Sequence, residues 1–248
     1  TFLDPACGSG NFLTETFISL RRIENDILNR LKRGQTELGF DADFSPIKVS
    51  INQFYGIEIN DFAVTVARTA LWIAEHQMLR ETQKIVRHDL DFLPLKSYDN
   101  IREGDALALN WCEITEQPVA VTDIYAKRTN IVPGEMKVFE PIASFGNINL
   151  HTDEIVVNKP IAPTTYHITY DYIIGNPPFV GYSLQSKEQK EALRSIYVDY
   201  HGRPYKTAGK IDFVAGWYFK AAQVMASRHT RCAFVSTNSI CQGEQVAS

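Results

Sequence analysis

The sequence lacks the features of a membrane or secreted protein. No apolar run approaches the roughly 18 residues that a membrane-spanning helix requires. The chain begins Thr1-Phe2-Leu3-Asp4, which has neither the basic region nor the small-residue cleavage site of a signal peptide. Without such segments, the sequence predicts no membrane partner.

Cysteine and histidine are too scattered to predict a metal site. The cysteines form no C-x-x-C pair, which argues against a zinc site and a disulfide framework. They are Cys7, Cys112, Cys232 and Cys241. The histidines show no ligand spacing such as H-x-x-x-H. Asp123 with Glu135 and Lys137 mimics a nuclease signature, but so loose a pattern arises easily by chance. The sequence therefore predicts no metal and a reducing, cytoplasmic location.

Composition and charge are those of an ordinary soluble globular protein. Of the 248 residues, 44% are hydrophobic and 22% are charged, and the length suits one α/β domain or two small ones. The formal net charge of −4 gives no overall attraction to phosphate. If the partner is nucleic acid, the basic surface must be local or must lie outside this chain.

The chain alternates β-type runs with amphipathic helical stretches. Strands are predicted over 1–4, 53–59, 101–104, 170–175 and 231–237, and helices over 11–33, 61–80 and 212–228. This alternation predicts an α/β fold with a mostly parallel sheet and helices on both faces. Ligands of such sheets bind at the carboxyl ends of the strands, where each motif described below lies.

One stretch interrupts this alternation. Residues 111–170 are polar and rich in turns, with β-type runs such as 154–157, so we interpret them as an insertion with a small β-element. The first residue already lies in the first predicted strand, and the last lies just past the fifth. We therefore expect the chain to be part of a larger protein.

The first motif places two glycines between a strand and a helix. It reads Asp4-Pro5-Ala6-Cys7-Gly8-Ser9-Gly10-Asn11-Phe12. Gly8 and Gly10 allow a tight turn and a close approach of a ligand to a helix N-terminus, whose N–H groups are free. G-x-G alone fits a plain strand–helix turn equally well. The longer string favours a binding site in which Asp4 meets the cationic amino group of a ligand.

The next two strands end in acidic residues. Glu58, in the run 54–60, can accept two hydrogen bonds from ribose hydroxyls, and Ile59 can pack on an adenine face. Asn60 fits better as the N-cap of the following helix. Asp105 follows the third strand in Gly104-Asp105-Ala106-Leu107, where a carboxylate can bind an adenine amino group. Alone, this last motif would be a turn.

The fourth motif, Gly175-Asn176-Pro177-Pro178-Phe179, favours one chemistry. Its prolines hold the chain extended after a strand. The side-chain oxygen of Asn176 and the carbonyl of Pro177 can then accept from a single –NH2 group. The exocyclic amine of adenine is a poor nucleophile because its lone pair is delocalised. Two acceptors draw it toward tetrahedral geometry, and Phe179 offers a stacking face for a base outside the duplex.

These four strings resemble motifs I to IV of the class I, S-adenosylmethionine-dependent N6-adenine DNA methyltransferases. The cofactor motifs precede N-P-P-F, an order similar to that of the gamma group. With Val180-Gly181 and with Asp212-Phe213-Val214, the chain looks most like the MmeI-like type IIG restriction–modification enzymes, although type I modification subunits share the two main strings. The resemblance covers most of the chain except 111–170.

The resemblance implies a Rossmann-like class I methyltransferase fold, with residues 1–248 as a catalytic core truncated at both ends. It implies S-adenosylmethionine as cofactor, held by Asp4, Ala6, Gly8, Gly10, Glu58, Ile59, Asp105 and Ala106. The target base, a flipped adenine of double-stranded DNA, would be held by Asn176, Pro177, Pro178 and Phe179. The target-recognition domain, and a nuclease if one is attached, would lie outside this chain.

Basic and aromatic side chains alternate in residues 183–210. The basic residues are Lys187, Lys190, Arg194, Arg203, Lys206 and Lys210; the acids are Glu188, Glu191 and Asp199; the tyrosines are Tyr182, Tyr197, Tyr200 and Tyr205. Beside a base pocket, this composition suits a surface that follows a nucleic-acid backbone and stacks on bases. The alternating charges of 187–194 also fit a solvated helix. The position directly after Phe179 favours DNA contact.

Three other functions fit parts of the pattern. The same acceptors suit any planar amine, so N4-cytosine and protein glutamine are alternative substrates, although glutamine methylators usually differ from D-P-A-C-G-S-G-N in their first motif. A C5-cytosine mechanism needs a Pro-Cys pair, which the sequence lacks. A catalytically idle module that binds cofactor or DNA in a restriction complex is the last alternative, and the intact Asn176 and Phe179 argue against it.

Overall fold

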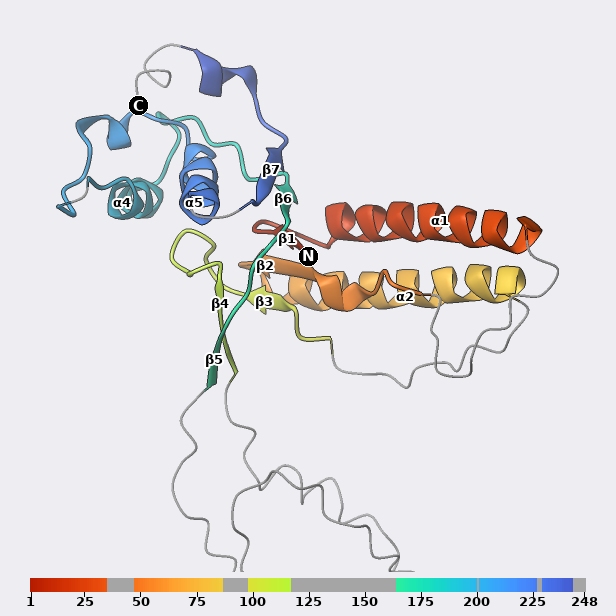
Figure 1. Cartoon of the computed structure of the whole chain (residues 1–248). Helices are drawn as coiled ribbons and strands as arrows, with labels where there is room; N and C mark the ends of the chain where they lie inside the picture. The colour runs from red at the N-terminus through yellow and green to blue at the C-terminus, as the bar shows by residue number, and fades with distance from the viewer. Residues whose placement is uncertain (35–46, 87–97, 117–163, 200, 227–228, 243–248) are drawn as a thin grey trace, which may run out of the picture. The chain divides into compact units, whose positions relative to one another are not determined.

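The centre of the fold is a parallel sheet. The computed structural model describes residues 1–34, 47–86, 98–116, 164–199, 201–226 and 229–242. Five strands pair in parallel in the order β3-β2-β1-β6-β7 (Figure 1). They are β1 (Phe2–Asp4), β2 (Phe54–Glu58), β3 (Ile101–Glu103), β6 (Tyr172–Gly175) and β7 (Arg231–Phe234). Because all run the same way, their carboxyl ends meet at one edge.

Helices cover both faces of this sheet. On one face lie α1 (Asn11–Gly34) and α2 (Asp61–Val86), and on the other lie α4 (Lys187–Ile196) and α5 (Ala215–Met225) (Figure 1). From β1 the chain passes through α1 to β2 and through α2 to β3, on one side of β1 in the sheet. From β6 it passes through α4 and α5 to β7, in the opposite direction along the sheet. Because such crossovers are right-handed, the two pairs of helices lie on opposite faces. The predicted α/β fold is confirmed.

Three 3-10 helices complete the described structure: η1 (Ile51–Gln53), η2 (Lys206–Gly209) and η3 (Asn238–Cys241). No helix in the described ranges is long and apolar enough to cross a membrane.

Several predicted boundaries were wrong by a few residues. The helix predicted over 61–80 continues to Val86. The helix predicted over 212–228 begins only at Ala215, because the backbone of 212–214 forms a turn closed by the N–H of Ala215 and the carbonyl of Asp212 at 3.0 Å. The strand predicted over 170–175 begins at Tyr172. Tyr170 is instead buried, and its hydroxyl donates to the carbonyl of Trp111 at 2.8 Å.

The core between α1, α2 and the sheet is apolar and tightly packed. Its fully buried side chains include Leu13, Phe17, Phe54, Ala67, Leu71 and Ile101. A Cβ at Gly10 would lie 3.0 Å from Cβ of Ala67, so α2 packs directly against the turn that follows β1. This packing fixes the turn relative to the second helix.

The described residues cluster in two compact units. The larger comprises 1–112 and 169–248 and contains the five-stranded sheet; the smaller comprises 113–168. Within the smaller unit, β4 (Glu113–Glu116) pairs antiparallel with β5 (Thr164–His167). The β-type run predicted at 154–157 lies outside the described residues, as do Asp123, Glu135 and Lys137.

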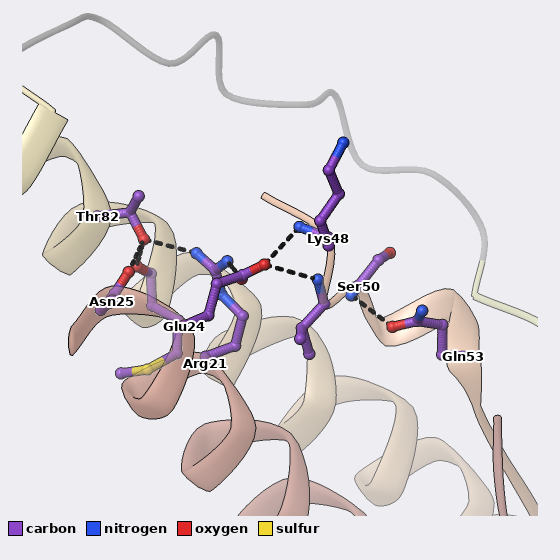
Figure 2. Close-up of polar contacts among 9 residues, drawn as sticks. Arg21, Glu24, Asn25, Lys48, Ser50, Gln53 and Thr82 are labelled. Carbon is purple, nitrogen blue, oxygen red and sulfur yellow. Dashed lines mark hydrogen bonds and ion pairs between the residues drawn. The ribbon is translucent and has the colours of Figure 1, made fainter. Parts of the chain in front are cut away.

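A buried polar cluster joins α1 to the end of α2 (Figure 2). The Arg21 guanidinium, 1% exposed, pairs with the Glu24 carboxylate and donates to Oγ1 of Thr82 at 2.6 Å. The hydroxyl of Thr82 lies 2.7 Å from Oδ1 of Asn25. Glu24 in turn accepts from the backbone N–H of Lys48 at 2.6 Å, which holds the chain that leads to β2. A buried charge here is tolerated because it is paired and hydrogen-bonded.

We expect Thr82→Val to lower the free energy of local opening of α1 and α2 by about 1–3 kcal/mol, because the isosteric change leaves buried groups of Arg21 and Asn25 without a partner. Native-state hydrogen exchange of the helix amides measures this energy. Thr69→Val is the matched control. The Thr69 hydroxyl donates to the backbone carbonyl four residues earlier in α2, at 2.8 Å, but Thr69 is exposed. Equal effects of the two changes would contradict the role of the cluster.

Candidate active site

The turn after β1 is shaped by its two glycines and by backbone hydrogen bonds within the turn and to β2. Gly8 and Gly10 have φ of 53° and 82°, left-handed values that favour glycine. The N–H of Cys7 donates to the carbonyl of Ile57 at 3.0 Å, and the N–H of Gly10 to the carbonyl of Cys7 at 2.8 Å. Burial raises the pKa of the Cys7 thiol, which keeps it protonated and unreactive. Cys7 is therefore not a candidate nucleophile.

Asp4 lies beneath this turn and not on the surface. It is 1% exposed, and its Oδ1 accepts from the N–H of Ala6 at 3.0 Å. A Cβ at Gly175 would overlap Oδ1 of Asp4, so only glycine fits at the end of β6. Burial raises the pKa of Asp4 to about 7; the Ala6 N–H opposes this rise and the nearby Glu58 adds to it. Asp4 therefore joins the turns after β1 and β6.

Glu58 joins two turns by one carboxylate. Its Oε2 accepts from the N–H of Gly8 at 3.0 Å, and its Oε1 accepts from the N–H of Asn60 at 3.0 Å. Each carboxylate oxygen has a second lone pair that can accept from a ligand hydroxyl. Oδ1 of Asn60 accepts from the N–H of Ala63 at 3.0 Å, so Asn60 caps α2 as predicted.

The turn after β3 is held by Asp105 and by a lysine of α5. Oδ1 of Asp105 accepts from the N–H of Leu107 at 2.8 Å. Nζ of Lys220 donates to the carbonyls of Leu107, at 3.0 Å, and of Leu109, at 2.5 Å. Burial lowers the pKa of Lys220, and the charge of Asp105 partly offsets this. Lys220 could not be predicted from the sequence, because its partners are backbone atoms more than one hundred positions away.

The turn after β6 carries the Asn-Pro-Pro-Phe string. Asn176 and Pro178 are exposed and Pro177 is buried. Within the described part of the chain, the Asn176 amide makes no hydrogen bond, so it is open to a ligand. The Phe179 ring is 44% exposed, which leaves a face available for stacking.

One cavity of about 540 Å³ connects these turns, a volume typical of small-molecule sites. Of the predicted site residues, it is lined by Ala6, Glu58, Ile59, Asp105, Ala106, Asn176 and Pro178. Asp4, Gly8, Gly10, Pro177 and Phe179 are not part of its lining. The cavity thus brings residues of the four motifs together, although each motif contributes only some of its predicted members.

The lining also includes residues that the sequence did not predict for the site. From α4 come Glu188, Gln189 and Ala192, and from the region of α5 come Phe213 and Trp217. The indole N–H of Trp217 donates to the carbonyl of Pro5 at 3.1 Å, across 212 positions of sequence. Only the capping box that starts α4, with Ser186 and Gln189, was visible locally as a helix signal.

Comparisons with known proteins identify the family of this chain. The family model described as MmeI, DNA-methyltransferase domain matches residues 1–248. The chain belongs to this family. DNA methyltransferase A of Bacillus subtilis (strain 168) is 34% identical to the MmeI-type chain over 247 residues. The matched stretch covers 99% of the MmeI-type chain and 22% of the Bacillus protein.

A solved structure shares the fold of this MmeI-type domain. The type IIL restriction–modification enzyme MmeI in complex with DNA matches with a TM-score of 0.67 and 33% identity, over 100% of this chain and 26% of that one. The chain thus spans about a quarter or less of the length of these relatives. The predicted resemblance to MmeI-like enzymes is confirmed.

The segment after Phe179 differs in part from the surface predicted for DNA. Tyr182 and Tyr205 are 52% and 49% exposed. Tyr197 instead stacks on Phe219, with ring centroids 4.3 Å apart, and burial raises its pKa. Arg203 pairs with Asp199 at 3.1 Å. Tyr200 lies outside the described residues.

We expect Asp4→Asn to change how stability depends on pH. Because the folded-state pKa is raised from 3.8 to about 7, wild-type Asp4 contributes most to stability below its unfolded pKa, and this contribution is lost as pH rises through the folded pKa. Asn keeps an acceptor for Ala6 but cannot ionise. The free energy of unfolding of Asp4→Asn relative to wild type should therefore rise by about 2 kcal/mol between about pH 5.5 and pH 8. A difference that does not vary with pH would show that Asp4 titrates normally.

Proposed function

We propose that the protein transfers a methyl group from S-adenosylmethionine to N6 of an adenine rotated out of double-stranded DNA. The observation that carries this proposal is the shared cavity: Asn176 and Pro178 line it together with Glu58 and Asp105. An acceptor for a planar amine and carboxylates for a nucleoside therefore face one space. The family membership supports DNA as the methyl acceptor.

The cavity has the charge expected for a cationic ligand. Among its described lining residues are three carboxylates, Glu58, Asp105 and Glu188, and no lysine, arginine or histidine. Such a lining favours a positively charged ligand and opposes the phosphates of a nucleotide cofactor. S-adenosylmethionine fits this donor set because it combines a sulfonium and an ammonium with a nucleoside, and when bound it supplies an electrophilic methyl group.

The residues of the first three turns would hold this cofactor. Glu58 would accept from the ribose hydroxyls, Ile59 and Ala106 would pack on the adenine, and Asp105 would accept from its amino group. Gly8, where an added Cβ would meet no other atom, would leave room for the methionine part beside Ala6, and Gly10 would shape the turn against α2. Asp4 would act on the ammonium across the turn that it supports, since its carboxylate bonds the N–H of Ala6.

The turn after β6 would prepare the target amine. The amide oxygen of Asn176 and the carbonyl of Pro177 would each accept from one N–H of the adenine amino group, which reduces conjugation of its lone pair with the ring. Phe179 would stack on the base, and base–aromatic stacking is worth about 1–3 kcal/mol. Lys187 and Lys190 on α4 would contact phosphates of the DNA.

The proposal is tested by identifying the methylated product. The full-length protein is incubated with methyl-labelled S-adenosylmethionine and genomic DNA from a strain without adenine or cytosine methylation, and the DNA is digested to nucleosides. We expect the label in N6-methyladenine. Label in N4-methylcytosine, or in protein rather than DNA, would establish one of the alternative substrates. Cofactor binding without any transfer would identify an idle binding module.

We expect Glu58→Ala to weaken cofactor binding by well over tenfold, because two hydrogen bonds to a charged acceptor contribute roughly 2–4 kcal/mol. Since Glu58 also holds the turns through Gly8 and Asn60, calorimetry is repeated with the 2′-deoxyribose analogue of the cofactor. Wild type should prefer the ribose form, and Glu58→Ala should lose that preference. A preference that survives in the variant would remove Glu58 from ribose binding, whatever happens to the affinity.

A further inference from the structure

The backbone that follows Phe179 is tied to one short stretch of chain before α5. The carbonyl of Val180 accepts from the N–H of Phe213 at 2.9 Å, and the N–H of Tyr182 donates to Oδ1 of Asp212 at 3.1 Å. The side chain of Gln185, which is buried, donates to the carbonyl of Ile211 at 2.8 Å. Three consecutive residues, 211–213, therefore hold three points of the turn between β6 and α4.

Asp212 makes a second contact that reaches another turn. Its Oδ2 accepts from the hydroxyl of Ser239 at 2.8 Å. Ser239 belongs to η3, which follows β7, and β7 is the parallel neighbour of β6 with Gly175 opposite Phe234. One carboxylate thus joins the turns after two adjacent strands. It does so at the edge of the sheet where the cavity lies.

The position of the Phe179 ring depends on these contacts. The ring is 44% exposed and Tyr182 is 52% exposed, so core packing does little to orient this part of the chain. Phe213, next to Asp212, lines the cavity with Asn176 and Pro178. Phe213 therefore forms part of the cavity wall, and the same short stretch, Asp212-Phe213, also anchors the turn that carries Phe179. Small displacements of groups that position a substrate can lower the reaction rate by large factors.

We propose that Asp212 is the positioning residue for the target-base side of the site. Its carboxylate fixes the turn that carries Phe179 and fastens it to the turn after β7, without touching the base. This inference rests on the proposed adenine methylation and adds to it a residue that acts through Phe179. The Asp212-Phe213-Val214 string, which carries part of the family resemblance and lies at the predicted helix start, acquires a role in the turn that precedes the helix.

The test compares Asp212→Ala with Asp212→Asn in the full-length protein. Asp212→Ala removes both carboxylate oxygens, the acceptors for Tyr182 and Ser239. Asn keeps an oxygen for Tyr182, and the Ser239 hydroxyl can accept from the new amide instead of donating. Single-turnover methyl transfer to DNA should fall about 30- to 100-fold in Asp212→Ala and stay within about threefold in Asp212→Asn. The dissociation constant for S-adenosylmethionine should stay within about threefold in both.

Two controls separate positioning from loss of stability. Thr82→Val removes a buried hydroxyl of the α1–α2 cluster and should leave the methyl-transfer rate unchanged despite its cost in stability. In a Phe179→Ala background, adding Asp212→Ala should lower the rate by less than about threefold, because both changes disable the same turn. A purely structural role for Asp212 would leave its effect undiminished in that background.

The inference is overturned if Asp212→Ala transfers methyl groups within threefold of wild type, if it weakens cofactor binding as much as it lowers the rate, or if its effect persists without Phe179. If Asp212→Ala does not fold, Ser239→Ala removes only the second contact and should lower the rate about three- to tenfold; a wild-type rate would overturn the inference. If wild type itself labels no adenine, the proposed function fails, and that outcome is distinct from failure of Asp212 alone.

Discussion

The site depends on the parallel pairing of β1 with β2 on one side and β6 on the other. This pairing brings Asp4, Glu58 and Gly175 to one edge of the sheet, although the chain between them spans most of the larger unit. The fit is close, because the Asp4 carboxylate occupies the space that any side chain at position 175 would need. The turn after β1 and the start of the Asn-Pro-Pro-Phe turn therefore meet at this contact.

The carboxylates at this edge of the sheet hold the turns in shape, and two of them also contribute negative charge to the cavity. Glu58, Asp105 and Asp212 each accept backbone N–H groups of a turn, so each turn keeps its form before any ligand arrives. The oxygens of Glu58 and Asp105 also line the cavity and make it negative. Groups that are already oriented need no reorganisation when charge develops during a reaction. The proposed cofactor and target amine would thus meet groups that are already in place.

The sequence predicted the parts of the site that follow directly from strand ends. The turns at Gly8, Glu58, Asp105 and Asn176 each come just after a strand, and parallel strands must bring such turns together. The wall formed by α4 and Trp217 could not be predicted, because Trp217 meets Pro5 through packing between distant segments. Local composition also led to a wrong expectation: it favours Tyr197 as a stacking residue beside DNA, but the Tyr197 ring packs on Phe219 inside the domain.

In the proposed reaction the Asn176 amide oxygen activates the adenine amine, and single-turnover methyl transfer by the full-length protein to DNA containing its site measures this role. Asn176→Ala should lower the rate roughly 100- to 1000-fold while cofactor affinity is kept, because one acceptor at the reacting atom is lost. Asn176→Asp retains an acceptor and should keep part of the activity. Transfer by Asn176→Ala at a rate near that of wild type would contradict the account.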